Sequence, residues 1–271
     1  MTKHPDIARV AAIIADVAAE AIMPRFRKLA AADVSEKTGP HDLATVADTE
    51  AERLLAMRLQ ALAPGSTVVG EEAVSADETV MDRLGGPDPV WIVDPIDGTT
   101  NFATGLPMFG CMVAYAIAGE TRAAWIHDPV HGRTAMAERG GGAWLDGRRA
   151  STVKPRNLAA MHGTLSIRSG TRERAAQLGA RANRVASVLI LRCAAHEYMA
   201  MLEGSSHFAI YNRIMPWDHA PGAMMVEEAG GFAARIDGRR YRPGDPVAGE
   251  PLLVAPDREH WEMVRECFFR P

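Results

Sequence analysis

Two carboxylates share one tight turn in the stretch Asp94-Pro95-Ile96-Asp97-Gly98-Thr99-Thr100, which follows the apolar run of residues 90–93. The run predicts a buried strand, and Pro95, which lacks an N–H donor, is expected to end it. Gly98 allows a close backbone approach, and the residues after it can begin a helix whose free N–H groups suit a phosphate. Two carboxylates repel such an anion unless cations lie between them. The stretch therefore predicts a magnesium site beside a phosphate site, with an acidic turn that only caps a helix as the alternative.

Two acids elsewhere in the chain fit the same site. Glu71 follows residues 67–70, a short apolar run that predicts a strand. Asp218 follows Trp217 and begins a predicted helix over residues 218–229. Each acid has a simpler alternative role, an exposed strand end for Glu71 and an N-cap for Asp218. An N-cap aspartate can also bind a metal only if one of its oxygens stays free.

Composition excludes several classes of protein. The chain has 271 residues, of which 47% are hydrophobic and 24% are charged, so collagen-like, coiled-coil and disordered proteins are excluded. Its 30 basic and 34 acidic residues give a net charge of −4, so we expect no nucleic acid as a main partner. The longest apolar run, residues 111–118, is too short to span a membrane, and no secretory signal is visible.

The cysteines point to a reducing compartment. Cys111, Cys193 and Cys267 are an odd and scattered set, which forms neither a disulfide framework nor a zinc cluster. We expect each to be a small core residue and the protein to be cytoplasmic.

Helix and strand patterns alternate along the chain. Apolar spacings of three and four predict helices over residues 7–21 and 48–62, and residues 33–40 are expected to form a loop. Strand patterns form a meander in the middle of the chain, and helices and strands such as residues 185–191 alternate in the second half. The order predicts a layered α/β or α+β architecture. A boundary near residue 150 predicts an N-terminal lobe, 1–150, with the metal and phosphate site, and a C-terminal lobe, 151–271, that completes it.

Three separated segments together resemble the inositol monophosphatase family, in the family's order and spacing and over nearly the whole chain. They are Gly70-Glu71-Glu72, Asp94-Pro95-Ile96-Asp97-Gly98-Thr99-Thr100-Asn101-Phe102, and Pro216-Trp217-Asp218 with the later Glu228-Ala229-Gly230-Gly231. The resemblance implies the layered αβαβα sugar-phosphatase fold, two or three Mg²⁺ ions and a homodimer. Its metal ligands would be Glu71, Asp94, Asp97, Asp218 and the backbone carbonyl of Ile96.

The resemblance also implies catalytic roles. The segment Asp42-Leu43-Ala44-Thr45-Val46-Ala47-Asp48 is similar to an early family segment, Asp-Leu-Val-Thr-x-x-Asp. Asp48 would pair with Thr99 to orient the attacking water, with Glu71 as the third catalytic residue. Gly98 and Thr99 would hold the phosphate through backbone N–H groups, and Lys37 resembles a position that neutralises it.

The implied reaction is magnesium-dependent hydrolysis of a small phosphate monoester by a metal-activated water, without a phospho-enzyme. Typical inositol monophosphatases have Gly-Ser-Ala-Ala where this chain has Arg192-Cys193-Ala194-Ala195, and a glutamate near Tyr211. The lost carboxylate and added arginines favour a substrate with a second negative charge over a neutral polyol. The predicted substrate contacts are Arg192, His196, Tyr211 and Arg213.

Three other functions are alternatives to this prediction. Within the superfamily, a histidinol-phosphate, 3′-phosphoadenosine or fructose-bisphosphate phosphatase is an alternative. An aspartyl-phosphate phosphatase would have Asp-x-Asp, whereas here the two acids of Asp94-Pro95-Ile96-Asp97 are one residue further apart. A non-catalytic phosphate-binding subunit is the alternative of another class, but loss of a metal acid would signal it and all four are present.

Overall fold

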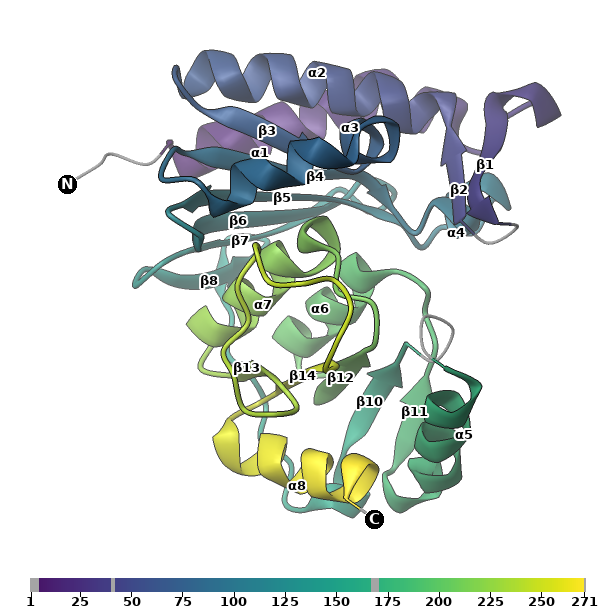
Figure 1. The fold of residues 1–271 in the computed structure, drawn as a ribbon, viewed down its shortest axis with the longest axis vertical. Coiled ribbons are helices and arrows are strands. Elements are labelled where there is room, and N and C mark those ends of the chain that lie inside the picture. Colours follow the sequence, from purple (N-terminus) through teal and green to yellow (C-terminus); the bar gives the residue numbers. More distant parts are fainter. Residues whose placement is uncertain (1–4, 40–41, 167–170, 271) are drawn as a thin grey trace.

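Helices and sheets alternate in five layers (Figure 1). The structure is a computed structural model that describes residues 5–39, 42–166 and 171–270. Its long helices are α1 (Ile7–Val17), α2 (Val46–Leu62), α5 (Arg172–Arg181), α6 (Ala194–Glu203), α7 (Pro216–Glu228) and α8 (Arg258–Phe269). α1 and α2 cover one face of a seven-stranded sheet, and α6 and α7 lie between that sheet and a five-stranded sheet. α5 and α8 cover the far side, which confirms the predicted αβαβα layering.

The seven-stranded sheet places two predicted metal acids side by side. Its strand order is β3-β4-β5-β6-β7-β8-β9. Its strands are β3 (Thr67–Gly70), β4 (Val90–Asp97), β5 (Gly110–Ile117), β6 (Glu120–Asp128), β7 (Arg133–Glu138), β8 (Gly142–Leu145) and β9 (Arg148–Arg149). β3 and β4 run parallel, and Gly70 pairs with Val93. Glu71 and Asp94 therefore follow at the same edge of the sheet.

Strand β4 does not end where the sequence predicted. We expected a break at Asp94-Pro95, but the strand continues to Asp97. Its antiparallel pairing with β5 shifts register between Asp94 and Asp97. Because Pro95 cannot donate to the ladder, the pairing becomes irregular without the strand ending.

The five-stranded sheet has the order β11-β10-β12-β14-β13. Its strands are β10 (His162–Leu165), β11 (Ser187–Leu189), β12 (Phe208–Tyr211), β13 (Phe232–Arg235) and β14 (Leu252–Ala255). The predicted strand over residues 185–191 shortens to three residues, because only these pair with β10.

The division of the chain into two lobes at residue 150 remains a prediction. Helices α6 and α7, which belong to the second half of the chain, pack on strands of the first half.

Short elements lie between the long helices and strands. We expected a loop at residues 33–40, but the structure has two antiparallel strands there, β1 (Val34–Gly39) and β2 (Asp42–Thr45). Backbone hydrogen bonds hold this pair together, so its sequence needs no alternation of apolar residues and gave no strand signal. The helices α3 (Glu71–Ala76) and α4 (Thr99–Ala103) follow β3 and β4. Single-turn helices lie at Ala18–Ile22, Met23–Arg25, Ala31–Asp33, Leu158–Ala160 and Ala182–Arg184, and a longer 3₁₀ segment at Glu78–Gly85.

Helix α7 lies at the centre of the molecule and packs against both sheets. Gly222 lets α6 approach closely, because a Cβ there would lie 2.0 Å from the ring of Tyr198. One turn earlier in α7, His219 is 2% exposed. Its Nδ1 lies 3.2 Å from the Tyr198 hydroxyl, and its Nε2 lies 3.0 Å from the Arg213 carbonyl.

Among the described helices, none combines the length and apolar character needed to cross a membrane.

Acid is expected to destabilise the fold through His219. Burial lowers the pKa of this imidazole to about 3, whereas in the unfolded chain it lies near ~6.5. The unfolded state therefore binds the proton more tightly, so stability present above pH ~6.5 is lost as the pH falls. Between pH 7 and pH 5 the wild type should lose about 2 kcal/mol more unfolding free energy than His219→Gln. Urea unfolding at both pH values measures this difference, and equal losses in the two proteins would contradict it.

Candidate metal and phosphate site

Three aspartates converge where the two halves of the chain meet. One carboxylate oxygen from each of Asp94, Asp97 and Asp218 lies within 4.8 Å of the others. Asp94 and Asp97 come from β4 and are buried, whereas Asp218 is half-buried. Asp218 is the third residue of α7, and Met215 is the N-cap. The N-cap alternative for Asp218 is therefore wrong.

The cluster has the electrostatics of a cation site. Burial raises the pKa of Asp94, and the neighbouring carboxylates of Glu71, Asp97 and Asp218 raise it further. Within the described residues, the buried Oδ1 of Asp94 has no hydrogen-bond partner. Carboxylate oxygens are the ligands that magnesium prefers. A divalent cation would satisfy the orphaned oxygen and neutralise the repulsion, so these residues fit the predicted metal.

Glu71 forms an ion pair with a lysine of the same chain. Lys37, on β1, lies 2.9 Å from the Glu71 carboxylate and 2.6 Å from that of Glu72. Burial lowers the pKa of Lys37, but the charges and hydrogen bonds of the two glutamates outweigh it and raise the pKa overall. The Lys37 side chain is only 10% exposed, so it is part of the site and not a surface lysine.

Glu52 is a residue that the sequence analysis missed. Its carboxylate accepts hydrogen bonds from the backbone N–H groups of Glu72, at 2.7 Å, and Ala73, at 2.8 Å. A Cβ at Gly70 would lie 2.3 Å from the Glu52 Cδ, so only glycine admits this carboxylate. Glu52 thus fixes the direction in which Glu71 leaves β3. The available signal was its position one helical turn after Asp48 on α2.

Asp97 is held by the start of α6. Its Oδ2 accepts hydrogen bonds from the Ala195 backbone N–H, at 2.5 Å, and from the Cys193 thiol, at 3.1 Å. Burial raises the pKa of Cys193, and the Asp97 charge adds to this, so the sulfur remains a thiol donor. Cys111, Cys193 and Cys267 are all free and buried, as the sequence predicted.

Gly98 connects β4 to α4 in a conformation that needs glycine. Its φ is +86°, and a Cβ there would lie 3.1 Å from the Met108 carbonyl and 3.2 Å from the Cys193 Cβ. The next residue, Thr99, is buried and begins α4. Both predicted phosphate-binding residues therefore lie directly after Asp97.

The Thr99 hydroxyl has two acceptors for one proton. Its Oγ1 lies 2.9 Å from the Ile96 carbonyl and 3.3 Å from the Asp48 Oδ1. The structure thus brings together the predicted pair and the predicted carbonyl ligand. The other Asp48 oxygen accepts from the N–H and hydroxyl of Thr45, at 2.8 and 2.6 Å. Burial raises the pKa of Asp48 to about 8, although the Thr45 hydrogen bonds lower it.

Two of the predicted substrate residues lie close to the segment from Gly98 to α4. Arg192 adopts a positive φ of 57° and donates to the Asn101 Oδ1 of α4 at 3.0 Å. His196, on α6, places Nε2 3.3 Å from the Phe109 carbonyl and 3.8 Å from a carboxylate oxygen of Asp128. Its side chain is 18% exposed.

The other two lie at the end of β12 and face different ways. Arg213 is exposed. Burial and the carboxylates of Asp97 and Glu71 raise the pKa of Asp218, and the charge of Arg213 offsets part of this rise. Tyr211 is 3% exposed, with its ring 5.5 Å from that of Tyr198 and 4.4 Å from that of His219. This placement does not suit the substrate contact predicted for Tyr211.

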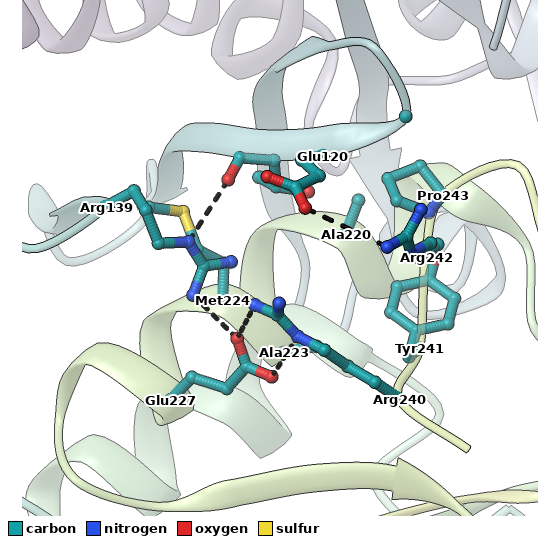
Figure 2. Close-up of a pocket in the computed structure, with 12 residues that line it drawn as sticks. Glu120, Arg139, Ala220, Ala223, Met224, Glu227, Arg240, Tyr241, Arg242 and Pro243 are labelled. Atoms are coloured by element: carbon teal, nitrogen blue, oxygen red, sulfur yellow. Dashed lines mark hydrogen bonds and ion pairs between the residues drawn. The ribbon is translucent and has the colours of Figure 1, made fainter. Parts of the chain in front are cut away.

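The far end of α7 is fixed to the first sheet. Figure 2 shows Glu227 between Arg139 and Arg240. The nitrogen–oxygen distances of these two ion pairs are 2.7 and 3.1 Å, and all three residues line a cavity of about 20 Å³. Glu228 accepts from the backbone N–H groups of Gly140 and Gly142. The glycine-rich turn at residues 140–142 therefore helps to hold the helix that carries Asp218.

Comparison with known proteins gives the same family over most of the chain. A model of the inositol monophosphatase family matches residues 5–266. A fructose-1,6-bisphosphatase/inositol-1-monophosphatase of Thermotoga maritima is 34% identical over 208 residues, 76% of this chain and 77% of that protein. The Nus factor SuhB of Escherichia coli K12 is 31% identical over 263 residues, 93% of each chain.

A solved structure agrees. A Thermotoga maritima IMPase has a TM-score of 0.75 and 28% sequence identity, and the match covers 96% of this chain and 92% of that one. Phosphatases among the relatives support phosphatase activity, and the acidic cluster could bind the metal that the family generally uses. On these matches, the chain belongs to the inositol monophosphatase family.

Proposed function

We propose that this protein hydrolyses a small phosphate monoester with the help of magnesium. The observation that carries the proposal is the convergence of Asp94, Asp97 and Asp218, one oxygen from each within 4.8 Å. The cluster adjoins Gly98 and Thr99, where β4 ends and α4 begins. An anion and a divalent cation can therefore meet at one place.

The residues would divide the chemistry between them. Bound magnesium would polarise the phosphate and lower the pKa of a water molecule. Glu71 and the three aspartates would hold the metal, with the Ile96 carbonyl as a further ligand. The backbone of Gly98 and Thr99 would bind the phosphate oxygens. The Thr99 hydroxyl, close to Asp48, would orient the attacking water and pass its proton to the carboxylate.

Metal removal tests the proposal. Hydrolysis of a panel of phosphate monoesters should fall to background after thorough chelation and should return when magnesium is added, because the carboxylate cluster repels phosphate without a cation. Release of inorganic phosphate measures the rate. Activity that survives chelation would sink the metal mechanism, and a wild type inactive on every ester with magnesium would sink the proposed function.

A non-catalytic role is the second candidate. One relative, 31% identical over 93% of the chain, is named as a Nus factor rather than as an enzyme. All four predicted metal acids are nevertheless present here, together with Thr99 and Asp48. The panel assay discriminates the two roles, because a subunit that only binds phosphate ligands would show magnesium-dependent binding without turnover.

A further inference from the structure

The side chain of Asn101, on α4, joins α4 to a segment that lies 90 residues further along the chain. It is 1% exposed. Its Nδ2 donates to the Met108 carbonyl at 2.9 Å and to the Leu191 carbonyl at 3.0 Å. Its Oδ1 accepts from the Arg192 guanidinium at 3.0 Å. Because carbonyls accept only from the amide nitrogen and a guanidinium donates only to the amide oxygen, these partners fix the direction of the carboxamide.

Arg192 has a backbone conformation that favours glycine. Its φ is +57°, at a position where typical inositol monophosphatases have glycine. A residue with a side chain keeps such a conformation only where the contacts around it hold it there. Asn101 binds both the carbonyl of the preceding residue, Leu191, and the Arg192 guanidinium. It therefore holds the backbone of residues 191–193, here called the clamped segment.

The clamped segment packs directly on the turn that carries a predicted metal ligand. A Cβ at Gly98 would lie 3.2 Å from the Cys193 Cβ and 3.4 Å from the Arg192 carbonyl oxygen. At this contact the Asp97 Oδ2 accepts from the Cys193 thiol, at 3.1 Å, and from the Ala195 N–H, at 2.5 Å. Two donors on one oxygen fix how the carboxylate is turned, and hence where its other oxygen points.

We propose that Asn101 is a positioning residue for Asp97, which it orients by holding the clamped segment against Gly98. The inference rests on the proposed function, in which Asp97 binds magnesium. The described bonds of the Asn101 side chain all go to the segment and to Met108, so the residue acts through the segment. Without these bonds the segment can move away from Gly98 and take the Cys193 donor with it. Magnesium then has to order a carboxylate that is no longer fixed, so it binds more weakly.

Alkylation of the buried cysteines tests the clamp without metal or substrate. Cys111, Cys193 and Cys267 are all free and buried, and peptide mass mapping gives the rate at which iodoacetamide modifies each in the native protein. In Asn101→Ala we expect the rate at Cys193 to rise about tenfold, because the segment opens locally, while the other two rates stay unchanged. The matched control is Thr104→Ala, an exposed change whose hydroxyl bonds to carbonyls of α4, and it should leave all three rates unchanged. No rise at Cys193, or an equal rise at all three cysteines, would overturn the clamp.

Calorimetric titration with magnesium tests the effect on the metal ligand. We expect Asn101→Ala, and Asn101→Ser with its shorter donor, to weaken magnesium binding by about tenfold, although neither removes an acid of the cluster. Thr104→Ala should bind magnesium as the wild type does. Cys193→Ser, which keeps a donor to Asp97, should retain more affinity than Cys193→Ala.

The titration also separates this inference from the proposed function. A wild type that binds no magnesium would overturn the proposed function and the inference that rests on it. A wild type that binds magnesium, but no more tightly than both Asn101 variants do, would overturn the inference alone.

Discussion

Replacing Asp94 with asparagine is expected to lower kcat/KM by about 1,000-fold, or about 4 kcal/mol, and at the same time to stabilise the metal-free protein. The rate falls because a charge is lost from the cluster that would hold the metal. The stability rises because burial and the carboxylates of Glu71, Asp97 and Asp218 all disfavour the charged form of Asp94. An amide of the same size removes that repulsion.

Thermal melting tests both halves of this prediction. Without metal, Asp94→Asn should melt about 2–4 °C above the wild type, as expected for ~1 kcal/mol in a chain of this size. Added magnesium should raise the wild-type Tm, since a ligand that binds only the folded state stabilises it, and should raise that of the variant less. Asp88→Asn, an exposed change just before β4, is the matched control. A variant that matches the wild type in magnesium-induced shift and kcat/KM would exclude Asp94 as a metal ligand.

The sequence indicated the acidic site because its signal is local. The apolar run before Asp94 and the one before Glu71 each predict a buried strand of the kind found in parallel sheets, with an acid directly after the run. The observed pairing of Gly70 with Val93 brings these acids together. Asp218 lies more than a hundred residues further along the chain. Its position in the sequence therefore does not predict that it meets the other acids, and only the resemblance to a family motif predicted that it belongs to the same site.

Other features depend on packing between distant segments. Glu52 reads as one more acid on an amphipathic helix, and its role comes only from contact with the backbone of α3. Tyr211 was expected in the substrate pocket, but the rings of Tyr198 and His219 bury it. Arg174 belongs to no sequence motif. Only the folded chain brings α5 and the end of β12 together, so that both line one cavity. Side-chain pattern does not encode such contacts between layers.

Replacing Thr99 with alanine should separate water orientation from metal binding. We expect kcat to fall about 100-fold, the usual contribution of a positioned proton-transfer group, while magnesium affinity changes little. The hydroxyl lies between the Ile96 carbonyl and the Asp48 carboxylate, at 2.9 and 3.3 Å, and it is not itself an acid of the cluster. Thr99→Ser, which keeps the hydroxyl, should retain most of kcat.

The Asp48 partner provides the decisive comparison. Asp48→Asn alone also disturbs the two hydrogen bonds from Thr45 at the start of α2, so its loss of rate mixes two effects. In a double-mutant cycle, Asp48→Asn should lower kcat much less in the Thr99→Ala background than in the wild type, because the pair acts as a unit. Pre-steady-state phosphate release ensures that chemistry limits the measured rate. Fully additive losses, or full kcat in Thr99→Ala, would show that the two residues do not share the orientation of the attacking water.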